Sequence, residues 1–231
     1  MRSQHVITGI AGLIAACLVG FGEYLLHYDA LARFAGSDYE FMRGIPADRS
    51  TTGHFVGVFG ATLYPVGCYH IYLMLRPANW LWAFLVFLVG SVGFMVGVVW
   101  VGSRASISAL IQLSGGAEIA ELVELYELRY ETLLQVIRFT TLFLSGVIVW
   151  LSLTGRSHYP RWIALFNPIL LIILNFLLYL IVPEIGKHTM PIALNVAFFI
   201  FFAISIIFAL RVSNDADERI FERANHQYRD Q

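Results

Sequence analysis

Long, unbroken apolar runs dominate the pattern of hydrophobic and polar positions along this chain. Continuous apolar runs are typical of membrane helices, in which every backbone polar group is hydrogen-bonded within the helix. None of these runs shows the alternation of apolar and polar residues that is typical of a membrane β-barrel. A bilayer core of about 30 Å needs about 20 apolar residues for one helical crossing. Six windows meet this requirement, at residues 6–28, 53–75, 79–103, 136–154, 161–183 and 189–212. The pattern therefore predicts an all-α fold, a polytopic membrane bundle of six transmembrane helices.

The same pattern divides the chain into one membrane domain, residues 1–212, and a polar tail, residues 213–231, which we expect to be partly disordered. Between the third and fourth windows, polar and apolar residues continue at helical spacing on both sides of Gly115 and Gly116. We therefore expect an extramembrane extension of helices three and four around a turn at these glycines. Its acidic residues predict a solvated face rather than a cation site, and they are Glu118, Glu121, Glu124, Glu127 and Glu131.

Composition and charge support a membrane protein and exclude several other classes. Apolar residues make up 58% of the chain and charged residues 13%, against roughly 25% charged in an average soluble domain. The formal net charge of -1 leaves no basic excess for phosphate recognition, so we expect no nucleic-acid partner. Two cysteines, both in apolar runs, exclude a disulfide scaffold. Membrane lipids are the expected partners.

Small residues recur at helical spacing in the second and third windows, a pattern that lets membrane helices approach closely. These residues are Gly53, Gly57 and Gly60, followed by Gly90, Gly93 and Gly97. We expect them to hold the second and third helices together. A homo-oligomer seam is the alternative, and the sequence does not separate the two.

Short motifs around the first two helices carry a family resemblance. They are the run Gly22–Tyr28, Arg49 ahead of Gly53, and Tyr69-His70 near the end of the second window. The chain resembles an uncharacterised family of bacterial six-helix membrane proteins with a Gly-acid pair, an Arg before the second helix and a Tyr-His pair. The resemblance implies a six-helix fold in the bacterial cytoplasmic (inner) membrane, and it implies no activity.

The distribution of basic residues orients the predicted bundle. An even number of spans puts both termini on one side, and that side carries slightly more Arg and Lys than the other, with fewer carboxylates. Because Lys and Arg accumulate on the cytoplasmic side, we predict that both termini are cytoplasmic.

Ionisable side chains inside predicted spans are the candidates for function, because each costs about 2.5–3.5 kcal/mol at the bilayer centre. Glu23 and His27 stand four residues apart and so share one helical face. Arg104 falls at the same predicted level, towards the outer side of the membrane. We predict Glu23, His27 and Arg104 as the catalytic residues of an outer pocket. The expected substrate-binding residues are Tyr28, Arg49, His54 and Arg138.

A metal site is a second chemistry that the same residue types allow. Imidazole and carboxylate groups are ligands for zinc and for non-haem metals. The candidate ligands are His27, His54, Glu184 and His188. Their spacing matches no known metal signature, and the sequence requires no cofactor.

We expect the outer pocket to bind a lipid-like or isoprenoid-like small molecule. In one interpretation Glu23 also acts as a general acid or base on it beside His27. The first alternative is a proton-coupled small-solute transporter, in which the same pair relays a proton. The second is a non-catalytic assembly or receptor subunit, in which Glu23 pairs with Arg104 or Arg49 and the polar set anchors helix ends.

Overall fold

The computed structural model describes residues 2–35, 39–113 and 117–229, and these residues form helices and no strand. Within these described ranges, five segments are long and apolar enough to cross a membrane, which indicates a membrane-embedded protein. They are Gln4–His27, Ala47–Leu75, Trp80–Ile111, Ala117–Leu153 and Pro183–Val212. The predicted all-α membrane fold is thus found, with five such segments rather than six.

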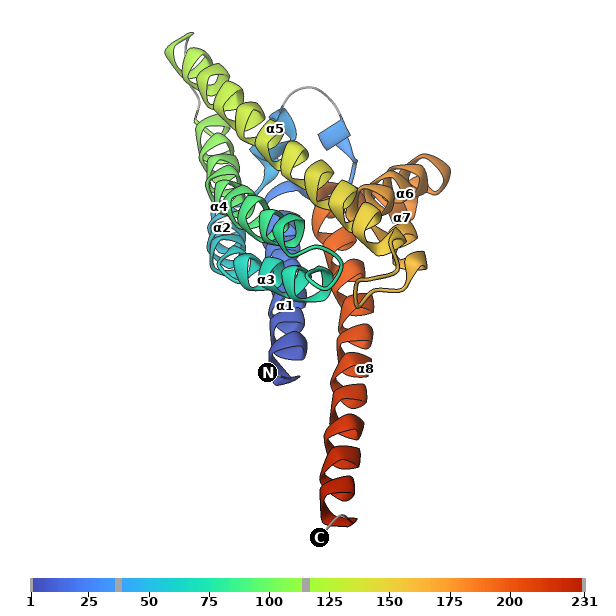
Figure 1. The fold of residues 1–231 in the computed structure, drawn as a ribbon. Coiled ribbons are helices and arrows are strands. Elements are labelled where there is room, and N and C mark those ends of the chain that lie inside the picture. The colour runs from blue at the N-terminus through green and yellow to red at the C-terminus, as the bar shows by residue number, and fades with distance from the viewer. Residues whose placement is uncertain (1, 36–38, 114–116, 230–231) are drawn as a thin grey trace.

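Long helices make up most of the bundle, and the shorter ones lie in two pairs on different sides of it (Figure 1). The α-helices are α1 (Arg2–His27), α2 (Ala47–Ala61), α3 (Tyr64–Leu75), α4 (Trp80–Ile111), α5 (Ala117–Leu153), α6 (Pro168–Ile181), α7 (Pro183–Thr189) and α8 (Ala193–Arg229). The 3-10 turns are η1 (Arg33–Ala35), η2 (Glu40–Gly44), η3 (Arg161–Phe166) and η4 (Met190–Ile192). The first turn of α1 and the last turn of α8 lie towards the same end of the molecule.

The second predicted span is two helices. The chain turns at Thr62 and Leu63, so α2 ends at Ala61 and α3 begins at Tyr64. Pro65 lies in the first turn of α3, where its missing N–H is tolerated, whereas in the interior of one continuous helix it would remove a hydrogen bond. The second window therefore crosses as a broken helix.

The predicted fifth span is not confirmed. Residues 161–166 form the 3-10 turn η3, and the side chain of Asn167 then caps α6 by accepting from the Leu170 amide. Pro168 occupies the first turn of α6, and Pro183 begins α7 after the chain leaves helical geometry at Val182. The 14 residues of α6 span about 21 Å at 1.5 Å per residue, which is short of a bilayer core.

The helices on both sides of the predicted turn extend beyond the predicted spans, as expected, and their position relative to the membrane stays a prediction. Helix α4 continues past Arg104 to Ile111, and α5 starts at Ala117; the predicted turn at Gly115 and Gly116 lies outside the described residues. The polar tail differs from the prediction, because α8 continues as helix to Arg229. Residues 213–229 contain no Gly or Pro to stop it, and they are rich in helix-forming residues.

The predicted packing of the second helix on the third is found in part, because Gly57 and Gly90 lie between them, whereas Gly53 and Gly60 of α2 pack against α1. A β-carbon on Gly53 would lie 2.7 Å from the Gly22 carbonyl oxygen, and one on Gly60 would lie 2.5 Å from Leu18 Cβ. Gly57 also faces Val101 on α4. Gly90 and Gly93 of α4 face Cys68 on α3 and Thr140 on α5. The consequence for the site is that α1 crosses α2 at backbone contact beside Glu23.

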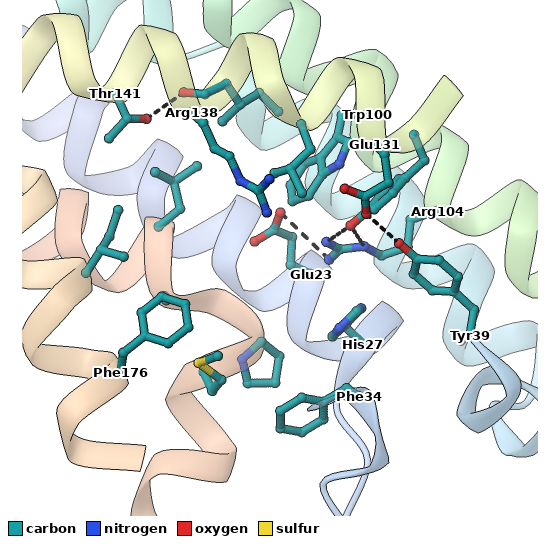
Figure 2. Close-up of a pocket in the computed structure, with 18 of the residues that line it drawn as sticks. Glu23, His27, Phe34, Tyr39, Trp100, Arg104, Glu131, Arg138, Thr141 and Phe176 are labelled. Atoms are coloured by element: carbon teal, nitrogen blue, oxygen red, sulfur yellow. Dashed lines mark hydrogen bonds and ion pairs between the residues drawn. The ribbon is translucent and has the colours of Figure 1, made fainter. Parts of the chain in front are cut away.

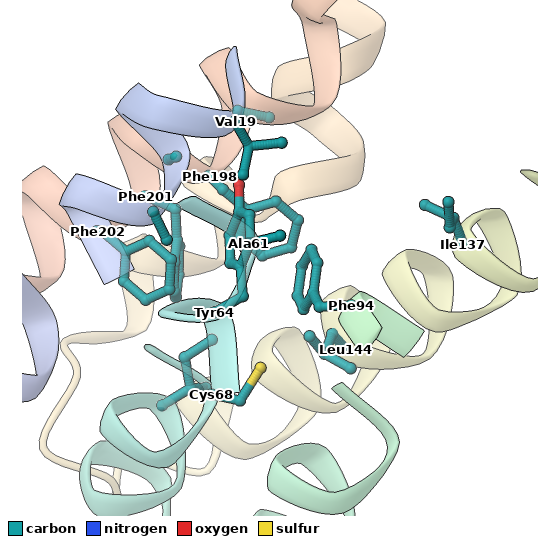
Figure 3. Close-up of a cluster of buried hydrophobic side chains, with 14 of the residues drawn as sticks. Val19, Ala61, Tyr64, Cys68, Phe94, Ile137, Leu144, Phe198, Phe201 and Phe202 are labelled. Atoms are coloured by element: carbon teal, nitrogen blue, oxygen red, sulfur yellow. The ribbon is translucent and has the colours of Figure 1, made fainter. Parts of the chain in front are cut away.

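Aromatic rings fill the centre of the bundle (Figure 3). The rings of Tyr64 and Phe94 stack with centroids 4.0 Å apart, and Phe198 lies edge-on to Phe94 at 5.0 Å. Phe201 and Phe202 are fully buried. Helices α3, α4 and α8 are therefore joined through a continuous apolar layer.

His70 belongs to a second buried polar group, near the first turns of α1. Its Nδ1 donates to the His5 carbonyl oxygen at 2.7 Å, since a carbonyl can only accept. Its Nε2 lies 2.6 Å from Ser205 Oγ, and Tyr159 Oη lies 2.6 Å from the same hydroxyl. Both ring nitrogens of His70 are satisfied, so this histidine ties α1, α3 and α8 together.

Candidate functional site

A cavity of about 500 Å³ lies between α1, α4, α5, α6 and the start of α8 (Figure 2). Four residues predicted from the sequence line it, namely Glu23, His27, Arg104 and Arg138. The structure thus brings together the three residues predicted to be catalytic and one of the four expected to bind substrate.

Glu23 is positioned by the tight crossing of α1 and α2 and by a hydrogen-bond chain to α8. The residue is 2% exposed, and Asn195 Nδ2 donates to its Oε2 at 2.6 Å. Asn195 Oδ1 in turn accepts from the Tyr64 hydroxyl at 2.5 Å, which fixes the orientation of the amide. One oxygen of the Glu23 carboxylate is therefore held by the protein, while the other, Oε1, faces Arg104.

Arg104 is held on two sides and is 3% exposed. Its Nε and Nη2 both donate to the Tyr130 hydroxyl oxygen, at 3.1 and 2.5 Å. The Trp100 ring, one turn earlier on α4, covers the guanidinium at 4.4 Å, a distance at which a cation is attracted to the ring face. The third nitrogen, Nη1, lies 3.8 Å from Glu23 Oε1 and has no hydrogen-bond partner. The pairing of Glu23 with Arg104, which one of the sequence interpretations proposed, is thus found as an ion pair at 3.8 Å.

Three buried nitrogens that belong to lining residues have no hydrogen-bond partner among the described residues. They are Arg104 Nη1, His27 Nδ1 and Trp100 Nε1. The His27 ring itself packs against Phe34 and Phe41, with centroids 5.8 and 4.9 Å away. Because more than nine in ten buried polar groups are normally hydrogen-bonded, three such atoms around one cavity indicate a polar binding region.

A tyrosine and a glutamate form the rim beside Arg104. The Tyr39 hydroxyl donates to Glu131 Oε1 at 3.0 Å, and its ring lies edge-on to Tyr130 at 5.5 Å. Burial, the largest cause, and the negative charge of Glu131 raise the pKa of Tyr39 above its ordinary value. The phenol therefore keeps its proton and remains a hydrogen-bond donor.

The opposite side of the cavity is apolar. It is lined by Ile169, Ile172 and Phe176 of α6, with Leu134 and Ile137 of α5 and Leu194 of α8. Figure 2 shows Phe176 across the cavity from Arg104 and Tyr39, with Glu23 between them. The site thus has a charged, hydrogen-bonding side and a hydrocarbon side.

The other predicted substrate-binding residues lie elsewhere. Arg49 Nη2 donates to the carbonyl oxygens of Tyr28 and Tyr24, at 2.7 and 3.3 Å, so it satisfies the end of α1. The Tyr28 ring stacks on His188 at 4.9 Å. His54 lies against Phe55 and faces the α4 backbone at Gly102. Of the predicted binding residues, Tyr28, Arg49 and His54 are therefore not cavity residues.

The predicted metal ligands are not gathered into one site. Glu184 pairs with Lys187 at 2.5 Å, His188 stacks on Tyr28, and His27 packs on aromatic rings inside the cavity. Within residues 2–35, 39–113 and 117–229, no group of three or more His, Cys, Asp or Glu side chains could hold a metal ion. The sequence prediction of a metal site is therefore wrong, because the structure does not bring together His27, His54, Glu184 and His188.

The sequence analysis did not assign to the site the residues that surround Arg104, which are Tyr39, Trp100, Tyr130 and Glu131. Trp100 could have been found, because it stands one turn before Arg104 and so shares its helical face. Tyr39 follows a loop, and its approach to Tyr130 depends on tertiary packing that no local spacing reveals.

Comparison with known proteins adds a family. A family model described as a family of unknown function, DUF6796, matches residues 1–212. No curated protein and no solved structure matches the chain. The matched region includes every candidate span and the whole cavity. The chain therefore belongs to the DUF6796 family.

Proposed function

We propose that this protein binds a single-chain, lipid-like amphiphile in the cavity between α1, α4, α5 and α6. The observation that carries the proposal is the two-sided chemistry of one cavity: buried Glu23 and Arg104 on one side, and Ile172 and Phe176 on the other. Its volume of about 500 Å³ is within the range of about 300–1,000 Å³ for small-molecule sites. A polar head and a hydrocarbon chain would each meet matching groups.

The exposed lining residues support access from within the bilayer. Phe176 on α6 is 44% exposed, and Arg138 on α5 is also exposed, so the cavity opens between these two helices. Helix α6 is mostly apolar, with the buried Asn175 donating to the Thr189 carbonyl oxygen, and at 14 residues it is too short to cross the membrane. An amphiphile dissolved in the bilayer would enter there with its chain beside α6 and its head towards Glu23. By the distribution of basic residues, this end of α1 is the outer side.

A chemical step at this site would depend on Glu23 Oε1. It is the carboxylate oxygen that Asn195 does not hold, so it is free to take a proton from a bound group or return one. Binding is the function that the cavity supports directly, and general acid or base action on the same ligand is the reaction class that its residues allow.

The transporter alternative is less well supported by the packing of the bundle centre. The rings of Tyr64, Phe94 and Phe198, below the cavity, are in contact (Figure 3). The space between Glu23, Tyr64 and Phe94 is about 20 Å³, which is room for about one water molecule and not for a chain of them. Binding therefore has a stronger structural basis than transport.

The proposal is tested by filling the hydrocarbon side of the cavity. Ile172 lines the cavity, whereas its neighbour Ile173 is 48% exposed and does not. Native mass spectrometry of protein purified in mild detergent should show a retained amphiphile on the wild type and on Ile173→Trp. On Ile172→Trp it should be lost, because the indole occupies the space of the chain.

Equal retention by the two tryptophan variants would place the amphiphile on the outer lipid-facing surface and contradict the proposal. So would a wild-type chain that carries no extra mass and takes up none from mixed micelles of a bacterial lipid extract.

A further inference from the structure

The ion pair at the polar side of the cavity is incomplete. Glu23 Oε1 and Arg104 Nη1 are 3.8 Å apart, whereas N–H···O hydrogen bonds are about 2.7–3.2 Å long. The remaining polar atoms of both side chains are used, because Asn195 holds Glu23 Oε2 and Tyr130 accepts from Arg104 Nε and Nη2. One acceptor and one donor, which belong to two residues of the cavity lining, therefore lie close together without forming a hydrogen bond.

The charges around the cavity are already balanced. Its lining has two carboxylates, Glu23 and Glu131, and two guanidinium groups, Arg104 and Arg138. Glu23 and Arg104 are the buried pair, so a charged head group inserted between them would leave one buried charge uncompensated. Such a charge is costly in a medium of low polarity. The balance therefore favours a head group without net charge.

We infer, on the basis of the proposed function, that the ligand carries an uncharged, hydroxyl-bearing head whose hydroxyl bridges Glu23 and Arg104. A hydroxyl combines one donor with acceptor lone pairs on a single oxygen, so it can donate to Glu23 Oε1 and accept from Arg104 Nη1 together. A further oxygen on the head can accept from the indole N–H of Trp100, a lining residue whose nitrogen has no partner in the part of the chain that the structure describes. Long-chain alcohols and monoacylglycerols have this chemistry.

Four probes with one chain length separate the contributions of head and chain. Hexadecanol and monopalmitoylglycerol have the hydroxyl; methyl palmitate has an acceptor but no donor; and palmitate at pH 8 has a negative charge. Their affinities for delipidated protein in detergent can be compared by native mass spectrometry titration. We expect both hydroxyl probes to bind about tenfold or more tightly than methyl palmitate, which leaves the Glu23 oxygen without a donor. We expect palmitate to bind more weakly than monopalmitoylglycerol.

The variant Glu23→Gln tests the bridging role without removing side-chain volume. Asn195 Nδ2 donates at this position, so the amide oxygen of Gln takes the place of Oε2 and the amide nitrogen replaces Oε1. The acceptor becomes a donor, and the preference for hydroxyl probes over methyl palmitate should disappear. The affinity for methyl palmitate should persist, which shows that the cavity is still folded. The matched control is Glu121→Gln, an exposed carboxylate on α5 outside the cavity lining, which should keep the preference.

Each outcome separates this inference from the proposed function on which it rests. If palmitate binds most tightly, or if all four probes bind equally, the hydroxyl-bearing head is wrong while amphiphile binding stands. If none of the four probes binds, the proposed function itself fails. Persistence of the hydroxyl preference in Glu23→Gln would also overturn the bridging role.

Discussion

Gly22 on α1 lies directly against Gly57 on α2, so that a β-carbon on Gly22 would be 2.5 Å from the Gly57 amide nitrogen. Real β-carbons do not approach a backbone this closely. Glycines of this kind let membrane helices meet at backbone contact. Because Glu23 is the next residue, this crossing determines where its carboxylate enters the cavity.

Replacing Gly22 by alanine should therefore separate α1 from α2 and displace Glu23. Overpacking of this kind costs about 1–3 kcal/mol, so the midpoint of thermal unfolding in detergent should fall. The matched control is Gly146→Ala in α5, where an added β-carbon meets nothing within 4 Å. That variant should unfold at or above the wild-type midpoint, because alanine is the better helix former. Equal midpoints for the two variants would show that the α1–α2 contact is not tight.

Tyr130→Phe should destabilise the protein through Arg104. The change removes the acceptor for two guanidinium donors and leaves them buried, at a cost of about 1–3 kcal/mol. Tyr126→Phe provides the control, because Tyr126 lies one turn earlier on α5, is only partly buried and interacts with Arg129 through its ring face. Thermal unfolding should separate the variants, with a clear loss only for Tyr130→Phe. A wild-type midpoint for Tyr130→Phe would mean that Arg104 finds another acceptor.

Much of the fold could be predicted from the sequence, and the parts that differ have physical causes. Hydropathy finds α1, α4 and the part of α8 up to Val212 because each is a continuous apolar run. Mean hydropathy over a window does not reveal that α6 is short. Pro168 and Pro183 interrupt the helix, but the mean hydropathy of the window stays high. It also could not assign partners to the α2 glycines, since small-residue spacing identifies a packing face but not the helix that packs there.

The charged residues of the candidate site could be predicted from the sequence, because a charged side chain in an apolar helix is costly and therefore conspicuous. Glu23 and Arg104 stand out in apolar helices for this reason, and the four-residue spacing adds His27. His188 and Arg49 also lie close to predicted helix ends, but they form local contacts there rather than lining the cavity. The sequence alone could not separate these groups, because linear position gives depth in the membrane and not direction around the bundle.

Asn195→Asp should be strongly destabilising although it changes only one atom. The Asn195 amide donates to Glu23 Oε2, and a carboxylate there would instead place a second negative charge about 2.6 Å away. The control is Asn79→Asp at the N-cap of α4, where the side chain accepts from the amides of Leu81 and Trp82. Aspartate caps a helix about as well as asparagine, so the thermal unfolding midpoint of Asn79→Asp should be close to that of the wild type. An Asn195→Asp protein that unfolds at the wild-type midpoint at pH 8 would contradict the hydrogen-bond chain.

Stability should fall with acid because of His158, in the turn before η3. Burial, followed by the nearby positive charges of His5 and Arg76, lowers the pKa of His158 below its ordinary value of 6.5. The folded protein therefore protonates His158 less readily than the unfolded chain does. The contribution of the neutral imidazole to the free energy of unfolding is complete above the ordinary pKa of histidine, and it is lost as the pH falls through that value. The unfolding midpoint should drop between pH 7.5 and pH 5.5, and His158→Gln should reduce that drop. Ser157→Ala, a non-titrating change at the neighbouring position, should lower the midpoint at both pH values and keep the wild-type drop. If His158→Gln also kept the full wild-type drop, the acid sensitivity would belong to another group.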